Sequence, residues 1–259
     1  MTKQTAIVTG STSGIGLAIA QTLAASGSNI LLNGFGDQSE IDAIADSIRN
    51  KFKVEVKYSS ADMSIPADIE AMVADCHEYF GSVDILVNNA GIQHTAPVED
   101  FPKDAWDRIM AINLSSNFHT IQAALPIMRS QGAGRIVNVS SVHGHVASVN
   151  KAAYVAAKHG VLGLTKVVAL ETANSAITCN AVCPGWVRTP LVQKQIDAFA
   201  EREDVSEEEA ISRMLGEKQP SKNFVTPKQI GQAVAYLCSD AATEIRGSTI
   251  NVDGGWLAQ

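Results

Sequence analysis

Short runs of Val, Ile and Leu alternate along the chain with longer segments in which apolar residues recur at helical spacing. This alternation is typical of repeated strand–helix units that build a parallel sheet. The apolar runs predict seven strands, at residues 5–8, 29–33, 54–59, 84–88, 134–140, 176–182 and 249–252. With helices on both faces of the sheet, we expect one doubly wound α/β domain that spans residues 1–259.

Residues 193–223 interrupt the alternation. The segment is rich in charge, yet Ile196, Phe199, Ile211 and Leu215 keep roughly helical spacing. One interpretation is a solvated helical pair. Because the segment follows the sixth strand, past the carboxyl ends where parallel sheets bind ligands, the other is a mobile helical lid over the substrate.

The composition limits the kinds of ligand and compartment. The 259 residues are 46% hydrophobic, which suffices for one large core. The net charge of -7 disfavours nucleic acid and anionic membrane surfaces, because both attract clustered Lys and Arg. The N-terminal residues lack a signal-peptide layout and no run of about 18 apolar residues follows, so we expect a cytoplasmic protein with a small ligand.

Four scattered cysteines argue against a disulfide framework, and without a compact Cys/His set we expect no metal site.

The first predicted strand runs into a glycine-rich turn, TGSTSGIGLA at residues 9–18, which precedes an Ala-rich helix. Glycines at this position let the backbone turn tightly and approach a pyrophosphate, whose charge lies against the helix N-terminus. This context predicts a dinucleotide site in a Rossmann-type fold, with a merely tight turn as the alternative.

The second strand ends at Asn33, without the carboxylate that usually binds the adenosine ribose. Neither residues 33–36 nor residues 11–13 offer an Arg or Lys for a 2′-phosphate, so the sequence favours NAD over NADP. Phe35 either lines the adenosine side or packs in its loop. Asp62, after the third strand, either accepts from the adenine amino group or caps the next helix. Residues 88–91 are small or polar, as expected where the backbone passes close to a cofactor ribose.

Tyr154 and Lys158 stand four residues apart, and Ser141 lies thirteen positions before Tyr154. On a helix this spacing places the phenol and the ammonium on one face, where the cation favours the phenolate. A tyrosine base near neutral pH needs its pKa lowered by about two to three units, roughly 3 to 4 kcal/mol. A buried cation together with a positively charged cofactor can supply that. A packed ring beside a solvated amine explains the same pair. Asn113, a polar residue amid apolar helical neighbours, needs a partner.

Together these residues resemble the classical short-chain dehydrogenase/reductase family over essentially the whole chain. The matching motifs are the glycine turn at 9–16, residues 88–91, Asn113, Ser141, Tyr154 with Lys158, and Pro184-Gly185. The resemblance implies that Tyr154 transfers the proton, Lys158 tunes its pKa and binds ribose, Ser141 donates to the carbonyl oxygen, and Asn113 holds a relay water.

The resemblance also implies a set of cofactor contacts, in which Thr189 meets the nicotinamide carboxamide. They are Gly10, Thr12, Ser13, Gly14, Ile15, Gly16, Phe35, Asp62, Met63, Asn89, Ala90, Gly91, Tyr154, Lys158, Pro184, Gly185, Val187, Thr189 and Leu191.

Residues outside the shared motifs indicate the substrate. Gln93, His143 and Lys151 place an amide, an imidazole and a cation near the reactive carbon, which suits a small carboxylate. Each also has a plain explanation: a helix cap for Gln93, a surface loop for His143 and a solvated amine for Lys151. Residues 91–97, 143–151 and 183–192 resemble family members that oxidise (R)-3-hydroxybutanoate to acetoacetate with NAD.

This closer resemblance implies that Gln93, His143, Lys151 and Gln195 hold the substrate carboxylate. It implies that Trp186 and Trp256 shape an apolar slot for the methyl end, although both could instead be packing or subunit contacts. A homotetramer joined through residues 252–256 is expected by similarity. Two other hypotheses stay open: an NADPH-dependent 3-oxoacyl-carrier reductase, and a nucleotide-sensing module without turnover.

Overall fold

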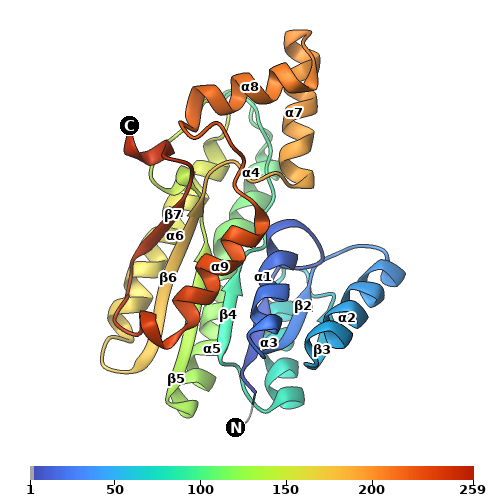
Figure 1. The fold of residues 1–259 in the computed structure, drawn as a ribbon. Helices are drawn as coiled ribbons and strands as arrows, with labels where there is room; N and C mark the ends of the chain where they lie inside the picture. Colours follow the sequence, from blue (N-terminus) through green and yellow to red (C-terminus); the bar gives the residue numbers. More distant parts are fainter. Residues whose placement is uncertain (1–2) are drawn as a thin grey trace.

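The computed structural model describes residues 3–259 and confirms the doubly wound α/β fold (Figure 1). In this part of the chain, seven parallel strands form one sheet in the order β3-β2-β1-β4-β5-β6-β7. The strands are β1 Thr5–Val8, β2 Asn29–Asn33, β3 Val56–Ser59, β4 Ile85–Asn88, β5 Ala133–Val139, β6 Ala176–Pro184 and β7 Thr249–Val252. The order reverses between β1 and β4, so the carboxyl ends of these two strands open a crevice for ligand.

All seven strands were predicted, and the differences lie at their ends. The strand expected at 54–59 starts only at Val56, because the Glu55 N–H donates to the side chain of Asn29 in β2 and not to a backbone carbonyl of that strand. The strand expected at 176–182 continues to Pro184, because β7 pairs with it as far as Pro184 and Val252. This extension carries β6 further toward the crevice.

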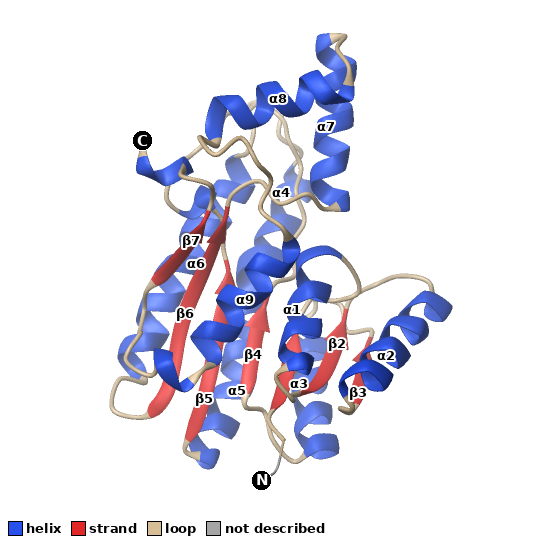
Figure 2. Cartoon of the chain, in the orientation of Figure 1, coloured by secondary structure: helices blue, strands red, loops and turns tan. Residues whose placement is uncertain are grey.

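Helices cover both faces of the sheet (Figure 2). Alternate strand residues point to opposite faces, so Ala6 and Val8 join one apolar cluster and Ile7 joins the other. The first cluster includes residues of α1 (Gly14–Ala25), α2 (Gln38–Phe52) and α9 (Pro227–Cys238). The second includes residues of α3 (Pro66–Phe80), α5 (Ser116–Gln131) and α6 (Ala152–Glu171). Helix α4 (Lys103–Met110) leads into α5 through a π-helical turn, Ala111–Ser115.

Helix α6 is long and apolar enough to cross a membrane, with a mean hydropathy of 1.2, a candidate that the sequence analysis overlooked. In the fold it is a core helix, because Ala157, Val161 and Val168 are buried. We found no signal-peptide layout in the N-terminal residues of the sequence. Two of these residues, Met1 and Thr2, lie outside the described part of the chain. Within the described chain, the four cysteines are buried free thiols.

Helices α7 (Pro190–Glu203) and α8 (Glu207–Lys218) stand above the carboxyl ends of the strands (Figure 1). The segment predicted at 193–223 is therefore helical, but its first helix begins at Pro190 because Thr189 caps it and proline fits the first helical turn. Val192, Ile196, Ala210 and Met214 form a small apolar cluster of their own. The two helices thus pack largely against each other, as expected for a lid that can move relative to the sheet.

Candidate active site

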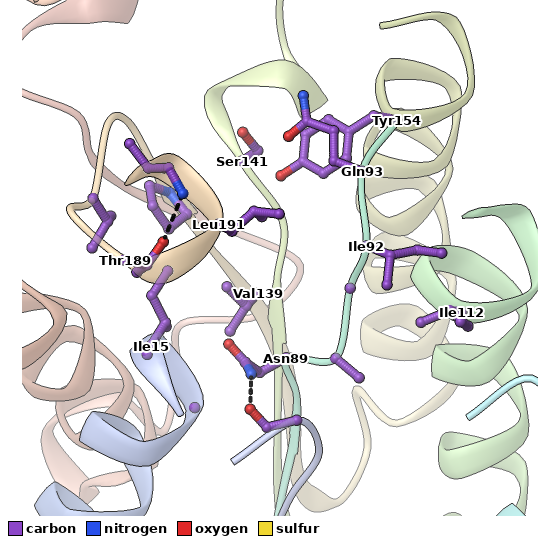
Figure 3. Close-up of a pocket in the computed structure, with 18 of the residues that line it drawn as sticks. Ile15, Asn89, Ile92, Gln93, Ile112, Val139, Ser141, Tyr154, Thr189 and Leu191 are labelled. Carbon is purple, nitrogen blue, oxygen red and sulfur yellow. Dashed lines mark hydrogen bonds between the residues drawn. The ribbon is translucent and has the colours of Figure 1, made fainter. Parts of the chain in front are cut away.

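A cavity of about 370 Å³ lies at the carboxyl end of the sheet, at the point where the strand order reverses. It is lined by every residue that the sequence predicted for cofactor, substrate or catalysis, apart from Asn113. Segments as distant in sequence as Gly10 and Trp256 meet here. Figure 3 shows Ile15, Asn89 and Thr189 toward one part of the cavity and Ser141, Gln93 and Tyr154 together in another.

The glycines of the turn let the backbone pack tightly against itself and against Ala90. Gly10 has φ +62°, and a Cβ on this residue would lie 2.9 Å from the Cα of Ala90. A Cβ on Gly16 would lie 2.2 Å from the carbonyl oxygen of Gly10. Among the described residues, the side chain of the N-cap residue Ser13 accepts no hydrogen bond from the first turn of α1, so these N–H groups remain available for an anion. The turn therefore fits a pyrophosphate.

Asn33 is a structural brace. Its Oδ1 accepts from the Gly10 N–H at 3.2 Å, while its Nδ2 donates to the carbonyls of Ser59 and Ala61 at 3.2 and 2.9 Å. The side chain holds the glycine turn and the end of β3 together. This explains in physical terms why the position lacks a free carboxylate for ribose.

Two alternatives at the adenosine end are resolved. Phe35 is 66% exposed and lines the cavity, so it is not a packed loop aromatic. Asp62 does not cap α3, whose N-cap is Ile65; it accepts instead from the N–H and hydroxyl of Ser64. These hydrogen bonds lower the pKa of Asp62. Contacts of Phe35 and Asp62 with adenosine stay predictions.

Asn113 lies behind the cavity wall. It is fully buried in the π-helical turn, where its Oδ1 accepts from the Ile92 N–H and its Nδ2 donates to the Ile92 carbonyl, both at 2.9 Å. The partner that this polar residue needed is thus the backbone beside Gln93. Asn113 fixes the strand-to-helix segment that forms one wall, and its role with a relay water stays a prediction. Wide helical turns of this kind occur often at functional sites.

Ser141, Tyr154 and Lys158 come together as the sequence predicted. Helix α6 places Lys158 one turn after Tyr154, with its Nζ 5.7 Å from the phenol ring centroid. The same Nζ donates to the carbonyl of Val139 at 2.8 Å, which anchors the amine at the end of β5. In Figure 3 the hydroxyls of Ser141 and Tyr154 lie near each other.

Burial sets the proton affinities of this pair. It lowers the pKa of Lys158 to about 8. It also raises the pKa of Tyr154, while a hydrogen bond from Ser141 opposes that shift. Lys158 and a positively charged cofactor were expected to lower the tyrosine pKa together; among the protein's own groups, desolvation has the largest effect and raises it. A basic Tyr154 therefore requires additional positive charge in the cavity.

The predicted carboxylate-binding residues surround the same end. Lys151 is the half-buried N-cap residue of α6, and its Nζ donates to Gln195 Oε1 on α7 at 3.3 Å and lies 5.1 Å from the Trp186 ring centroid. Burial lowers the pKa of Lys151 to about 8, so it is not the solvated amine of the alternative explanation. Gln93 is no helix cap, since α4 begins ten residues later. His143 is no surface residue, since it is 4% exposed.

Two buried donors at this end lack partners among the described residues: Gln93 Nε2 and Trp186 Nε1. Trp186 and Trp256 both line the cavity, with ring centroids 5.8 Å apart, and Trp256 packs edge-on against His143. The tryptophans are therefore part of the site wall. A buried donor without a partner is costly, which indicates that a ligand supplies the acceptor.

Some contributors escaped the sequence analysis. Ile92, Ile112, Val139 and Val142 line the cavity but are apolar and carry no chemical signature. Gln219 is fully buried, and its Oε1 accepts from the backbone N–H of Trp186 at 2.9 Å. A polar residue amid a charged, helical segment gives no sign in sequence that it will become buried. Ser148 lies in a loop, and its hydrogen bond with His143 gives no signal in the sequence.

The Rossmann-type sheet, the glycine turn and the Ser141, Tyr154 and Lys158 set define a dinucleotide-dependent oxidoreductase. A family model described as enoyl-(acyl carrier protein) reductase matches residues 10–257. The chain belongs to the short-chain dehydrogenase/reductase family, as its motifs indicated.

Within that family the chain is similar to D-beta-hydroxybutyrate dehydrogenases. The protein of this name from Cupriavidus necator is 55% identical over 99% of this chain and 98% of its own length. The one from Rhizobium meliloti is 52% identical over the full length of both. Among solved structures, an actinorhodin polyketide ketoreductase variant with NADPH has a TM-score of 0.92 at 36% identity, covering 98% of this chain and 97% of that one.

Proposed function

We propose that this protein oxidises (R)-3-hydroxybutanoate reversibly to acetoacetate, with NAD as its cofactor. The observation that carries the proposal is the half-buried cation Lys151, which lines one cavity with Ser141 and Tyr154. The similarity to D-beta-hydroxybutyrate dehydrogenases over full length supports the same substrate.

The site favours a small anion because Lys151 is desolvated without a balancing charge. In the described part of the chain, no carboxylate lies within ion-pair distance of its amine, which donates a hydrogen bond to the neutral Gln195 amide and lies over the Trp186 ring. A buried cation is costly until it is paired. A substrate carboxylate would pair with Lys151 and accept from the unpartnered Nε2 of Gln93, with Gln195 beside them. The aromatic rings of Trp186 and Trp256 would border the methyl end.

The reaction removes a hydride from carbon 3 and a proton from its hydroxyl group. When bound, NAD supplies the hydride acceptor and a positive charge that favours the phenolate. Tyr154 takes the hydroxyl proton, Ser141 donates a hydrogen bond to the reacting oxygen, and buried Lys158 stabilises the phenolate. Atoms and charge balance as hydroxy acid plus NAD⁺ giving keto acid, NADH and H⁺.

The charge distribution supports NAD over NADP. Among the described residues that line the cavity, the cations are Lys151 and Lys158, and both lie at the catalytic end. The adenosine end is formed by Thr12, Gly34 and Phe35, and the Thr12 hydroxyl donates to the Phe35 carbonyl at 3.0 Å. A 2′-phosphate placed there would lose its hydration without a cation to replace it.

We further propose a cytoplasmic homotetramer that acts on a small molecule, without nucleic acid or membrane as partner. Apolar side chains exposed on α4, α5 and α6 support association with further copies; they are Trp106, Phe118, Val167 and Leu170. The C-terminal residues expected to join subunits also serve their own chain, where Trp256 is buried in the site wall. Their place in an interface remains part of the proposal.

The deciding experiment is NAD reduction with each enantiomer of 3-hydroxybutyrate. We expect NADH from the R enantiomer, and an activity loss of about 10²- to 10⁴-fold in Tyr154→Phe with NAD binding nearly intact, because only the proton acceptor is removed. Acetoacetate reduction with NADPH in preference to NADH would favour an acyl-carrier reductase. If no small hydroxy acid yields NADH, a nucleotide-sensing module becomes the better explanation.

A further inference from the structure

His143 lies between two serines. Its Nδ1 is 3.4 Å from the Ser141 hydroxyl, and its Nε2 is 2.9 Å from the hydroxyl of Ser148. The ring is held edge-on by Tyr154 and Trp256, with centroid distances of 5.9 and 5.6 Å. Both ring nitrogens are therefore engaged within the protein, and the orientation of the ring is fixed.

The imidazole is neutral in this setting. Burial lowers the pKa of His143 to about 4, and the charge of Lys151 acts in the same direction. A neutral imidazole has one N–H donor and one acceptor nitrogen, and the hydrogen bond at one nitrogen decides which of them carries the proton. The two serines must therefore play opposite parts.

The part played by Ser141 decides whether its hydroxyl proton is free for catalysis. Its oxygen already accepts from the His143 backbone N–H at 3.2 Å. If Nδ1 carries the imidazole proton, the Ser141 oxygen accepts a second hydrogen bond and its own proton remains free to donate to the reacting oxygen. If Nε2 carries the proton, Ser141 must donate to Nδ1, and its hydroxyl proton is lost to the substrate.

We propose that Ser148 is a positioning residue, which donates its hydroxyl proton to His143 Nε2, thereby keeps the imidazole proton on Nδ1, and leaves Ser141 free to donate to the substrate oxygen. This role rests on the proposed function for its catalytic consequence. The tautomer itself is a property of the protein and can be measured without substrate. His143 then acts through Ser141. This replaces the carboxylate-binding role that the resemblance implied for His143, because an Nε2 without a proton cannot donate to a carboxylate.

The loop geometry favours such a device. Ser148 is only partly buried and lies four residues beyond the short helical turn Val142–Gly144 that carries His143, so the hydroxyl reaches back over the ring. In the proposed arrangement Ser148 donates to His143, and His143 donates to Ser141. Ser141 then donates to the oxygen beside Tyr154, so all these hydrogen bonds run in one direction.

The kinetic test is Ser148→Ala, with Ser148→Thr to restore the hydroxyl and Val149→Ala as the control. Val149 is the adjoining residue and is 86% exposed. We expect kcat of Ser148→Ala to fall about tenfold, less than the 10²- to 10³-fold cost of removing an oxyanion donor outright, because Ser141 remains but is misdirected for part of the time. KM for 3-hydroxybutyrate and the Kd for NAD should stay within about twofold of wild type. Ser148→Thr should recover most of kcat.

A substrate-binding role would give another result. If Ser148 or His143 Nε2 served only the carboxylate, Ser148→Ala would raise KM and leave kcat unchanged, and the proposal would be overturned. An unchanged kcat together with an unchanged KM would overturn it equally. A lower kcat that Ser148→Thr does not restore would indicate a packing defect and would also count against the role.

The second test reads the tautomer directly by long-range ¹H–¹⁵N correlation on histidine-labelled full-length protein, with and without NAD. The His143 signals are assigned by their loss in His143→Gln. We expect protonated Nδ1 and bare Nε2 in wild type, and a shift toward protonated Nε2 in Ser148→Ala. Protonated Nε2 in wild type would overturn the proposal even if the enzyme oxidises 3-hydroxybutyrate. Wild-type protein with the expected tautomer but without turnover would refute the proposed function alone.

Discussion

At the residue scale, the site contains ionisable groups whose pKa values burial shifts away from their ordinary values. Lys151 illustrates the consequence for substrate binding. Lys151→Ala should raise KM for 3-hydroxybutyrate by about 10- to 100-fold, since a hydrogen bond to a charged group contributes about 1.5 to 3 kcal/mol. Steady-state kinetics would measure this effect. The control is Lys194→Ala, because Lys194 is an exposed lysine on α7 and should leave KM unchanged. Equal KM values for both variants would exclude carboxylate binding by Lys151.

His143 should make the fold sensitive to acid. Its native pKa is lowered to about 4, whereas an unfolded histidine titrates near 6.5. Between these values the unfolded chain binds the proton and the native protein does not, so stability is present above pH 6.5 and is lost as the pH falls toward 4. Compared with His143→Gln, the wild type should lose about 2.5 kcal/mol of unfolding free energy between pH 7 and 4.5.

Urea unfolding at the two pH values, at one protein concentration, would measure that difference. His77→Gln is the control, because His77 is exposed on α3. It should show the same change with pH as the wild type. If His143→Gln also follows the wild type, the imidazole is protonated in the native protein near neutral pH, and the tautomer argument for Ser141 fails with it.

At the scale of elements, helices α7 and α8 pack mainly against each other and not against the sheet. Their shared apolar cluster is separate from the two clusters of the sheet, and Arg188 and Glu207 form an exposed ion pair at 2.7 Å that contributes little. Amides of these helices should therefore exchange hydrogen faster than those of α5, and should become protected when NAD and acetoacetate bind together. Exchange read by mass spectrometry would test the lid. Protection equal to that of α5 in the free protein would argue for a fixed wall.

The elements also show what could be predicted from sequence. Strands of a parallel sheet are buried on both faces, so continuous runs such as Ile30–Leu32 identify them locally, and the Tyr154 and Lys158 spacing carries directly onto a helix. The π-helical turn at Ala111–Ser115 could not be predicted from the sequence. It depends on hydrogen bonds between Asn113 and the backbone of Ile92, which lies twenty-one residues earlier. The hydrogen bond between Ser148 and His143 likewise depends on how the loop folds back.

At the scale of the whole molecule, the helices on one side of the sheet carry exposed apolar side chains. Helices α4, α5 and α6 bury their inner faces, yet Leu170 is 78% exposed and Val167 51% exposed on α6. Trp106 on α4 and Phe118 on α5 are also exposed, and α6 packs against α4. Apolar groups that remain exposed on neighbouring helices are typical of an interaction surface.

If this surface joins two copies of the chain, Val167→Glu with Leu170→Glu should lower the assembly state. Both side chains are exposed in the single chain, so the substitutions should change its own stability by no more than about 0.5 kcal/mol. In an interface, however, they would bury unpaired carboxylates. Light scattering after size-exclusion chromatography should show a tetramer for wild type and a smaller species for the double variant. Tyr79→Glu, on α3, controls for added charge and should remain tetrameric. A double variant that stays tetrameric would place the contact elsewhere, and a monomeric wild type would refute the assembly itself.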